Sequence, residues 1–492
     1  MKITLLTLFV SLNIYAQTQI GDNINGTNMS DQLGTNVSLS NNGSTIAVSS
    51  LNYVRVYKNI NNIWTQIGQD IVDSDQAATE GVNISLSDDG TVIALSSRFK
   101  DKDGTFLGKI RIYKNEGNIW TQIGQNIVGS DSKKIEVSIS LSGNGKVIAF
   151  RRKLNSPNPH KVSIYKNING IWNQIGSDIV GENELDWFGY SLSLSNDGNI
   201  IAIGAPNAYG IKGYNSGHVR IYKNINNVWT QVGEDIDGER GGNTIHAGGD
   251  GSGYSISLSD NGNIIAIGAP YNYINFPSEG YNAGHVRIYK NINNVWTQIG
   301  TEINGEDMID EFGASVSISN DGTIVAIGAT YASTIPGPRY GPGHVRVYQN
   351  INDKWTKTGT DIYGVSIGDE FGASVSLSGD GNTLSIGANS ADGGNKSNSG
   401  QVQVYDLSVI LSTKEIQLSK IGIFPNPAKN QISIKLHQGN QLKKISLYTS
   451  YGQYINSFNT NIINTTKFSR GIYFLKIETT ERKIAVEKII LK

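Results

Sequence analysis

Short runs in which apolar and polar residues alternate occur along most of the chain, separated by turn residues. One such unit, residues 186–233, contains GYSLSLS, then NIIAIGA after an Asn-Asp-Gly turn, and later HVRIYK and VWTQV. Alternation with a period of two is typical of half-buried β-strands, and Gly198 accepts the positive φ of a tight hairpin. The pattern predicts four short antiparallel strands in series, near 189–195, 199–205, 218–223 and 229–232.

The unit is repeated at intervals of 52 to 67 residues, measured between the tryptophans of successive copies. Repeats of this length with strand patterns stack as small sheets. The signature of the first strand occurs seven times, whereas the tryptophan strand occurs only six times. The first-strand signatures start at Asn36, Asn83, Ser138, Ser191, Ser255, Ser315 and Ser374, and the tryptophans are Trp64, Trp120, Trp172, Trp229, Trp296 and Trp355.

The last copy ends with QVQVYDL, residues 401–407, and lacks its fourth strand. The missing segment matches the N-terminus, because TQIG at 18–21 repeats TQIG at 65–68. Sheets of four antiparallel strands repeated in this way form the blades of a β-propeller, and a closed ring leaves no free edge. We therefore predict an all-β chain in which residues 17–407 form a seven-bladed β-propeller closed by its N-terminal strand.

Successive turns of an up-and-down blade lie at alternate ends of its sheet. The turns between first and second strands are uniform, as in SNDG at 195–198, and we call their end the hairpin face. The loops between second and third strands and between blades vary in length, and we call their end the variable face. Variable loops on a rigid scaffold commonly carry recognition, so the variable face is the predicted functional face.

The longest insertions on the variable face belong to the fifth copy, at 237–253 and 270–284. They place aromatic side chains beside polar and charged ones, and such aromatics stack on sugar rings or anchor a protein partner. Glycine-rich connectors whose aromatics fold onto the blade are the alternative. The candidate ligand-binding residues are Glu239, Arg240, His246, Asp250, Tyr271, Tyr273, Phe276 and Tyr281.

Two dipeptides mark the later copies. Phe-Gly opens the first strand at Phe188, Phe312 and Phe371, and Gly-Ala ends the second strand at Gly204, Gly268, Gly328 and Gly387. In these features residues 17–407 resemble the FG-GAP repeats of integrin-α-type propellers, although the first three copies lack both marks. The resemblance implies a seven-bladed fold and a binding or adhesion role. Many members hold calcium in a longer DxDxDG loop, but a short hairpin such as 195–198 cannot supply six oxygen ligands, so we expect no metal there.

The composition changes after residue 420. Residues 421–492 carry a net charge of +8, whereas residues 17–420 carry −10, and residues 408–420 connect the two. The segments 424–427 (FPNP), 451–452 (YG), 471–473 (GIY) and 488–492 resemble the C-terminal sorting domain of type IX secretion cargo. The resemblance implies the type IX secretion machinery as a partner, transport across the outer membrane, removal of this domain, and release or attachment at the cell surface. Alternating apolar positions at 431–436 and 472–477 independently predict a small Ig-like β-sandwich.

Residues 1–16 combine one lysine, an apolar stretch and Ala16, which predicts a cleaved secretory signal peptide, with a buried first strand as the alternative. Beyond them no apolar run is long enough to cross a bilayer as a helix. The chain has no cysteine, which excludes disulfides and thiolate chemistry. The mildly acidic body lacks the basic stripe that a nucleic acid partner requires. We expect a protein that is secreted or attached to the outer-membrane surface.

Acidic residues gather just before the Phe-Gly pairs. Two carboxylates at a set separation can cleave glycosides, but their repetition in several copies favours a structural role, since a catalytic pair is needed only once. The residues concerned are Glu184, Asp186, Asp310, Glu311, Asp369 and Glu370.

Histidines begin the third strand in three copies, at His218, His285 and His344. Equivalent positions in different blades diverge, so these histidines predict packing rather than a zinc site. His246 is the better candidate for chemistry, because it alone lies in a variable loop. No P-loop, GxSxG, HExxH or dinucleotide motif occurs in a suitable context.

Three functions remain open at this stage. The favoured one is a secreted or cell-surface protein that binds glycan or protein through the variable face, without catalysis and without a cofactor. The first alternative is a polysaccharide-degrading hydrolase or lyase that uses the paired carboxylates. The second is a structural protein of the surface matrix, which would self-associate without a soluble ligand.

Overall fold

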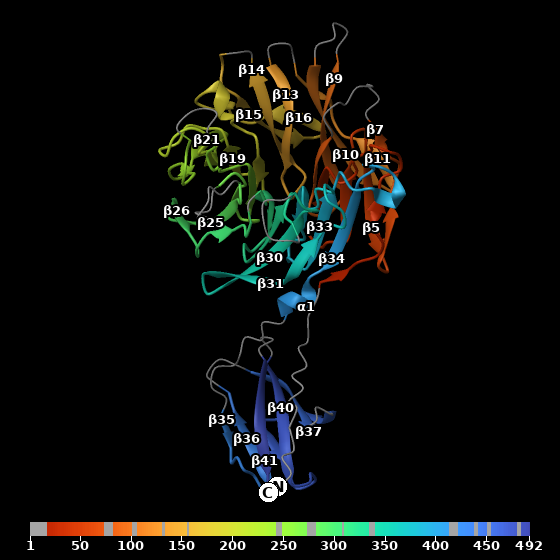
Figure 1. Cartoon of the computed structure of the whole chain (residues 1–492), viewed down its shortest axis with the longest axis vertical. Coiled ribbons are helices and arrows are strands. Elements are labelled where there is room, and N and C mark those ends of the chain that lie inside the picture. The colour runs from red at the N-terminus through yellow and green to blue at the C-terminus, as the bar shows by residue number, and fades with distance from the viewer. Residues whose placement is uncertain are drawn as a thin grey trace. The chain divides into compact units, whose positions relative to one another are not determined.

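The computed structural model contains almost no helix among its described residues. One α-helix, α1 (Ser408–Ser412), and two short 3-10 turns, η1 (Glu184–Asp186) and η2 (Gly393–Asn395), accompany 41 β-strands in that part of the chain. Contacts divide the chain into two units, Met1–Ser408 and Val409–Lys492 (Figure 1). The described residues are 17–72, 82–100, 106–129, 133–154, 157–242, 248–272, 282–307, 309–333, 340–412, 422–436, 441–449, 454–479 and 484–492.

Seven antiparallel sheets make up the first unit, and we number them by the copy of the repeat that begins each one. Sheet 1 holds β3 (Asn36–Leu39), β4 (Thr45–Ser49), β5 (Tyr53–Ile60), β6 (Ile63–Gln66) and β7 (Ile71–Val72). Sheet 2 holds β8 (Asn83–Leu86), β9 (Val92–Lys100), β10 (Phe106–Glu116), β11 (Ile119–Gln122) and β12 (Ile127–Val128). Sheet 3 holds β13 (Lys133–Leu141), β14 (Val147–Leu154), β15 (Lys161–Ile168), β16 (Ile171–Gln174) and β17 (Ile179–Val180).

The remaining four sheets follow the same order. Sheet 4 holds β18 (Leu192–Leu194), β19 (Ile200–Ala205), β20 (His218–Ile225), β21 (Val228–Gln231) and β22 (Ile236–Asp237). Sheet 5 holds β23 (Ser255–Leu258), β24 (Ile264–Ala269), β25 (His285–Ile292), β26 (Val295–Gln298) and β27 (Ile303–Asn304). Sheet 6 holds β28 (Phe312–Ile318), β29 (Ile324–Ala329), β30 (His344–Ile351) and β31 (Lys354–Tyr363). Sheet 7 holds β32 (Ser374–Leu377), β33 (Thr383–Ala388) and β34 (Gln401–Asp406), with β1 (Thr18–Gln19) and β2 (Ile24–Asn25).

The four strands predicted for each copy are present, and most sheets carry a fifth, short strand that the sequence pattern did not predict. In sheet 4 the chain leaves β21, turns at Gly233 with φ of 76°, and returns as β22 to pair with β20. Glycine permits this left-handed turn without a Cβ clash. In sheet 6 the same path forms one continuous strand, β31, with a register shift opposite β30.

The N-terminal strands complete sheet 7. β1 pairs antiparallel with β34, Thr18 opposite Asp406, and β2 pairs with the same strand, Ile24 opposite Val402. The segment also contacts sheet 1, because the indole N–H of Trp64 donates to the carbonyl of Ile20 at 2.9 Å. The residues next to the predicted signal peptide thus lie between the last sheet and the first.

The tryptophan of the repeat has the same role in each of the six copies that contain it. Its indole N–H donates to a backbone carbonyl of the preceding sheet, so each of these copies is tied to its neighbour through a part-buried donor. The pairs beyond Trp64 are Trp120 with Ile67, Trp172 with Ile123, Trp229 with Ile175, Trp296 with Val232 and Trp355 with Ile299.

Serines of the first strands form a closed set of hydrogen bonds. A serine hydroxyl in the first strand of one sheet accepts a backbone N–H from the first strand of the next sheet. The seventh such bond joins the Leu39 N–H of sheet 1 to the Ser376 hydroxyl of sheet 7. The other bonds run from Leu86 to Ser38, Leu141 to Ser85, Leu194 to Ser140, Leu258 to Ser193, Ile318 to Ser257 and Leu377 to Ser317. The alternating serines of the SxSxS signature therefore join neighbouring sheets.

The hairpin turns form a second closed set, made of backbone bonds only. Each bond joins the first turn of one sheet to that of another, and Gly379 of sheet 7 donates to Asn41 of sheet 1 at 2.7 Å. The remaining donor and acceptor pairs are Asn41 and Asp88, Asp88 and Gly143, Asn144 and Asn196, Asn196 and Asp260, Asp260 and Asn320, and Asn320 and Gly379.

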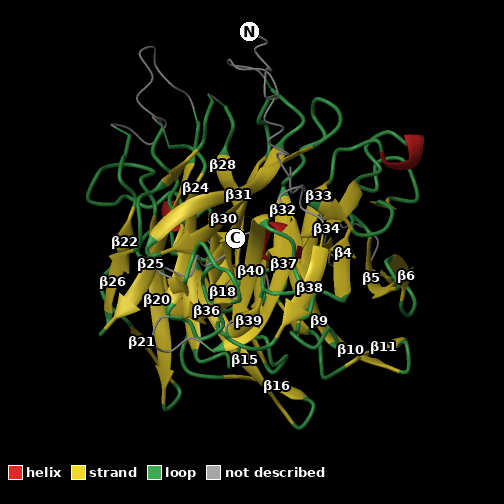
Figure 2. Cartoon of the chain, turned by 90° about the horizontal axis from the view of Figure 1, so that it is seen from below, coloured by secondary structure: helices red, strands yellow, loops and turns green. Residues whose placement is uncertain are grey.

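The hydrophobic core lies between neighbouring sheets. One cluster joins Val147 and Ile164 of sheet 3 to Leu194 and Ile203 of sheet 4. The Gly-Ala dipeptide is explained by close approach, because a Cβ on Gly204 would lie 2.2 Å from the carbonyl oxygen of Gly253 in the next sheet. Strands and loops dominate this unit throughout (Figure 2).

The second unit consists of two antiparallel sheets. One holds β35 (Gly422–Phe424), β36 (Gln431–Lys435) and β39 (Ile462–Asn464), and the other holds β37 (Leu442–Thr449), β38 (Tyr454–Phe458), β40 (Gly471–Thr479) and β41 (Ile484–Leu491). Ile432 and Ile434 of the first sheet share a buried core with Ile445, Leu475 and Ile477 of the second. Among the described residues of the whole chain, no helix has the length and apolar character needed to span a membrane.

Candidate functional site

A buried aspartate anchors a loop of the variable face in five of the seven sheets. Asp310 accepts hydrogen bonds from the backbone N–H groups of Glu306 and Asp307, at 3.2 and 2.9 Å. The equivalent carboxylates of Asp31, Asp186, Asp250 and Asp369 accept backbone N–H groups of their own loops. Paired buried polar groups of this kind fix loop conformation.

The anchoring aspartates are therefore occupied within the fold. Burial raises the pKa of Asp310 to about 6. Burial also raises the pKa values of Asp186 and Asp250, against the opposing effect of the backbone hydrogen bonds that they accept. These hydrogen bonds give a structural role to three of the six acidic residues that precede the Phe-Gly pairs, namely Asp186, Asp310 and Asp369.

The residue after each anchoring aspartate has a left-handed backbone conformation. Its φ is 51° at Gln32, 56° at Trp187, 65° at Gly251, 51° at Glu311 and 56° at Glu370. Such conformations are uncommon for residues other than glycine and often mark functional positions. One shared turn thus presents a tryptophan in sheet 4 and glutamates in sheets 6 and 7.

A pocket of about 620 Å³ opens beside Trp187 on the variable face of sheet 4. It lies between the segment that enters the sheet and the loop between β19 and β20. Trp187, Tyr209 and Tyr214 are 42%, 62% and 38% exposed, which is unusual for three neighbouring aromatics. The lining residues are Asn183, Glu184, Leu185, Asp186, Trp187, Asn207, Tyr209, Tyr214 and Asn215.

The loop that bears the two tyrosines is held by internal contacts. The Tyr209 and Tyr214 rings meet edge to face with centroids 4.8 Å apart. The backbone of Tyr214 exchanges two hydrogen bonds with Gly242, which lies in the connection between sheets 4 and 5. The Ser216 hydroxyl accepts the Gly210 N–H at 3.0 Å. The pocket is consequently pre-formed.

A row of aromatic rings runs from this pocket to sheet 5. Trp187 stacks on Tyr190 with centroids 5.6 Å apart, Tyr190 lies 4.9 Å from Tyr254, and Tyr254 lies 5.5 Å from Tyr271. Burial raises the pKa values of Tyr254 and Tyr271 to about 12 and also raises that of Tyr190, so all three hydroxyls are protonated at neutral pH.

On the variable face, the carboxyl groups of Glu311 and Glu370 interact electrostatically. Burial raises the pKa of Glu311 to about 7, the negative charge of Glu370 adds to the effect, and the Thr330 hydroxyl opposes it. Glu311 in turn acts electrostatically on Tyr254, Tyr271 and Tyr331. A half-buried carboxyl that keeps its proton near neutral pH can donate as well as accept a hydrogen bond.

The structure describes four of the eight ligand-binding residues predicted from sequence. Asp250 is fully buried and binds the N–H groups of Glu239 and Arg240 and the amide of Asn272, so its carboxylate is engaged inside the loop. Glu239 lies 3.6 Å from Arg287, and Tyr271 belongs to the aromatic row. His246, Tyr273, Phe276 and Tyr281 lie outside the described residues.

Sequence reasoning missed the pocket of sheet 4. It selected the longest loops, in the fifth copy, whereas the pocket is formed by shorter segments that meet only in the folded chain. One signal was available: Trp187 is the only one of seven tryptophans that lies outside the repeated tryptophan strand. Tyr190 and Tyr254 precede the SxSxS signature in copies four and five alone, where the sixth and seventh copies have alanine.

The third-strand histidines are packed and neutral. Burial lowers the pKa of His218 to about 4 and those of His285 and His344 to about 3. Across the part of the chain that the structure describes, no group of three or more His, Cys, Asp or Glu side chains is placed to hold a metal ion. Burial of the three rings is the observation that bears on the packing role predicted for these histidines.

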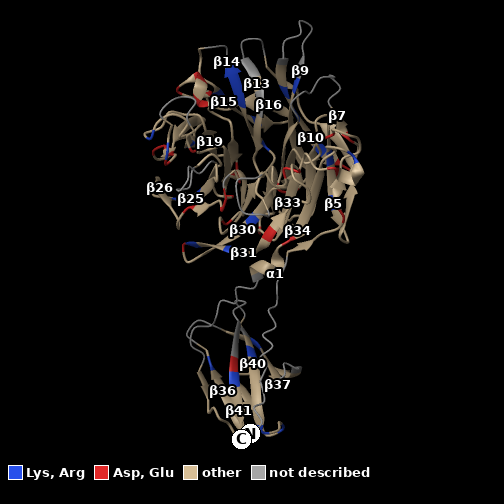
Figure 3. Ribbon diagram, in the orientation of Figure 1, with Lys and Arg blue, Asp and Glu red and all other residues tan. Residues whose placement is uncertain are grey.

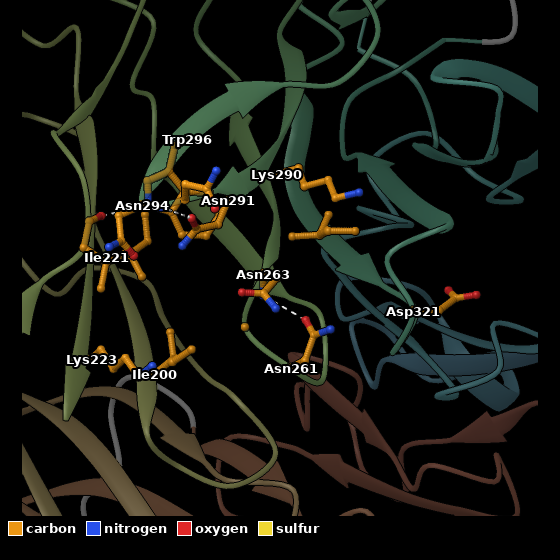
Figure 4. Close-up of a pocket in the computed structure, with 14 residues that line it drawn as sticks. Ile200, Ile221, Lys223, Asn261, Asn263, Lys290, Asn291, Asn294, Trp296 and Asp321 are labelled. Carbon is orange, nitrogen blue, oxygen red and sulfur yellow. Dashed lines mark hydrogen bonds between the residues drawn. The ribbon is translucent and has the colours of Figure 1, made fainter. Parts of the chain in front are cut away.

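A second pocket, of about 430 Å³, lies on the hairpin face between sheets 4 and 5 (Figure 4). Lys223, Asn263, Lys290 and Trp296 contribute to its lining. These residues belong to the repeated turns and strands, so the pocket is a consequence of the repeat rather than a feature of one copy. Along the ribbon of the repeat sheets, lysine and arginine positions occur among aspartate and glutamate positions (Figure 3).

Two family models match segments of the chain. Residues 364–405 match the FG-GAP repeat, and residues 422–492 match the secretion system C-terminal sorting domain. Both resemblances inferred from sequence are confirmed. The type IX sorting domain indicates that the protein is secreted or attached to the outer-membrane surface, and that an export machinery is its partner.

Comparisons with individual proteins add little. No curated protein matches the sequence. A solved structure of hydrazine synthase from Kuenenia stuttgartiensis is similar over 78% of this chain and 97% of that chain, with 12% sequence identity and a TM-score of 0.49.

Proposed function

We propose that residues 17–407 form a seven-bladed β-propeller in which each of the seven sheets is one blade. Two observations support this architecture. The serine bonds and the hairpin-turn bonds each pass through all seven sheets and return to the first. The strands β1 and β2 complete the last blade beside β34, as closure by the N-terminus requires.

The domain organisation follows from this architecture. Residues 1–16 act as a signal peptide, although they lie outside the described residues. Residues 408–420 serve as a linker, and residues 421–492 form a small Ig-like sandwich that addresses the chain to the type IX machinery and is removed on export. Removal would leave the propeller alone outside the cell.

The function that the geometry supports best is binding of a glycan or a surface protein through the variable face. The observation that carries this proposal is the pocket beside Trp187, with its three exposed aromatics and the row of rings leading away from it. Exposed aromatics that are held rigidly supply contact area at low entropic cost. A purely structural connector gains nothing from keeping three such rings in water.

The test is retention on immobilised ligands. The full-length chain is passed over purified algal, plant and bacterial polysaccharides and over surface proteins, and both retained protein and released reducing ends are measured. Retention without new reducing ends supports binding. Absence of retention on every polysaccharide and protein contradicts it.

A second candidate function, glycoside cleavage, is favoured by the glutamates rather than by the aspartates. Burial raises the pKa of Glu311 to about 7, as a general acid requires, and the charge of Glu370 acts on this carboxyl. Release of reducing ends that is lost in Glu311→Gln and in Glu370→Gln would establish this activity. Unchanged turnover in both variants would exclude these residues.

A further inference from the structure

The pocket beside Trp187 has a lining that discriminates between classes of ligand. It combines aromatic surfaces with side-chain amides and carboxylates: Trp187, Tyr209 and Tyr214 supply the rings, and residues such as Asn207 and Glu184 supply the polar groups. A pyranose ring has the matching character, because its C–H groups form an apolar face and its hydroxyls both donate and accept hydrogen bonds. Ligand sites in general pair an apolar wall with a few fixed polar groups.

The polar groups of the lining have capacity left for a ligand. The Asp186 carboxylate accepts the backbone N–H and the side-chain amide of Asn183 and is thereby engaged. Among the described residues, the side chains of Glu184 and Asn207 and the hydroxyls of Tyr209 and Tyr214 have no hydrogen-bond partner. Four groups around one pocket are thus available to sugar hydroxyls.

The charge of the lining disfavours acidic sugars. Among the described residues that line the pocket, Glu184 and Asp186 are acidic and none is a lysine or an arginine. Arg220, which acts electrostatically on Asp186, is already paired with Glu182 and Asp235, so a uronate or sulfate group would meet carboxylates whose charge is repulsive at short range.

The aromatic row holds Trp187 in place. Trp187 borders the pocket and also stacks on Tyr190, from which the row continues to Tyr254 and Tyr271. These three tyrosines are only partly exposed, so the rings open to a ligand are those of Trp187, Tyr209 and Tyr214.

We propose that the pocket of sheet 4 binds pyranose residues of an uncharged polysaccharide, with Trp187 and Tyr209 against the sugar ring and Glu184 and Asn207 bonded to its hydroxyls. This inference rests on the proposed binding function and narrows its ligand. It moves the principal contact from the loops of the fifth copy to those of the fourth.

The experiment is isothermal titration calorimetry of the full-length chain with two sets of oligosaccharides, neutral hexose oligomers (glucan, mannan and galactan series) and acidic ones (uronate and sulfated series). The variants are Trp187→Ala, Trp187→Phe and Tyr209→Ala. Tyr340→Ala is the matched control, because Tyr340 is also 61% exposed on the variable face, in the loop before β30 of sheet 6. Circular dichroism establishes that each variant is folded.

We expect one of the neutral series to bind the parent chain. The substitutions Trp187→Ala and Tyr209→Ala should each weaken this affinity at least 10-fold, and Trp187→Phe should weaken it less than Trp187→Ala does. Tyr340→Ala should bind as the parent does. If Tyr209→Ala and the parent bind a neutral oligomer with equal affinity, this pocket is not the binding site, although the broader proposal that the protein binds a ligand would stand. Preference for the acidic series would overturn the ligand class, and binding of proteins but of no oligosaccharide would overturn the glycan assignment.

Discussion

The backbone N–H of Gly379 donates to the carbonyl of Asn41 at 2.7 Å, and this bond joins the hairpin turn of the last sheet to that of the first. The same two sheets are joined by the serine bond from Leu39 to Ser376. If the seven sheets close into a ring, as proposed above, the ring has no free edge for other chains to pair with.

Deletion of residues 17–26 tests closure. The deletion removes β1 and β2 from β34 and takes the acceptor of the Trp64 indole with it. We expect the thermal midpoint to fall by several degrees and the protein to self-associate, because the outer edge of β34 is exposed. Differential scanning calorimetry and light scattering measure both effects.

A double-mutant cycle gives the matched control for that deletion. Trp64→Phe removes the indole donor together with part of the ring that packs against the core, and the lost hydrogen bond should contribute about 1 kcal/mol to its cost in the intact chain. In the chain without residues 17–26 the same substitution should cost about 1 kcal/mol less, since the acceptor at Ile20 is gone. Equal cost in both backgrounds would mean that Trp64 does not act through the N-terminal segment.

Ser193→Ala tests the serine bonds between sheets. The hydroxyl of Ser193 accepts the backbone N–H of Leu258 at 3.0 Å, and its loss leaves that N–H without a protein partner. We expect a loss of about 1 kcal/mol in the free energy of unfolding, measured with urea. Ser44→Ala, which removes an exposed hydroxyl bonded to Asn42, should change stability by less than half as much.

The anchoring aspartates can be tested at Asp310. Asp310→Ala leaves the backbone N–H groups of Glu306 and Asp307 without their acceptor, and we expect a loss of about 2 kcal/mol in the free energy of unfolding. Asp310→Asn keeps one acceptor oxygen and should lose less. If the two variants are equally stable, the carboxylate position does not hold the loop.

Glu311 should make stability depend on pH. Its pKa in the folded protein is raised to about 7 from the ordinary glutamate pKa of 4.5, so the folded state binds more protons than the unfolded state between these two pH values. The contribution of Glu311 to the free energy of unfolding is therefore largest below pH 4.5 and is lost as the pH rises through about 7. Glu311→Gln should therefore be more stable than the parent at pH 8, by about 1 kcal/mol after allowance for solvent screening, and equal to it at pH 4.5.

Thermal melts at the two pH values measure this difference. A stabilisation of Glu311→Gln that is the same at pH 4.5 and pH 8 would mean that the effect arises from packing and not from ionisation. Glu234→Gln, at an exposed glutamate with no ion pair among the described residues, is the surface control against which the Glu311→Gln difference is measured.

Much of the repeat could be predicted from the sequence, because its strands and turns obey local rules. The SxSxS signature, the Asn-Asp-Gly turns and the copy of TQIG at the N-terminus marked the strands, the hairpins and the edge at which β1 pairs. The short fifth strands could not be predicted in this way. The two residues of β22 show no alternation, and their pairing with β20 follows from the turn at Gly233.

The candidate site was less predictable, because it depends on contacts between copies. Loop length directed attention to residues 237–253, where Asp250 proved to be an internal anchor. The pocket arises because the left-handed turn at Trp187 and the loop of Tyr209 and Tyr214 meet on one face. Sequence alone gives neither that proximity nor the fraction of each ring left exposed.

The central claim is that ligands bind on the variable face, and one comparison of two variants tests it most directly. The first variant replaces residues 207–215 by a short Asn-Gly linker and removes one wall of the pocket beside Trp187. The second, Lys290→Ala with Asn263→Ala, alters the hairpin-face pocket of Figure 4. Retention of the full-length chain on its best polysaccharide or protein ligand should fall at least 10-fold in the first variant and stay unchanged in the second. The reverse result would place binding on the hairpin face and contradict the account.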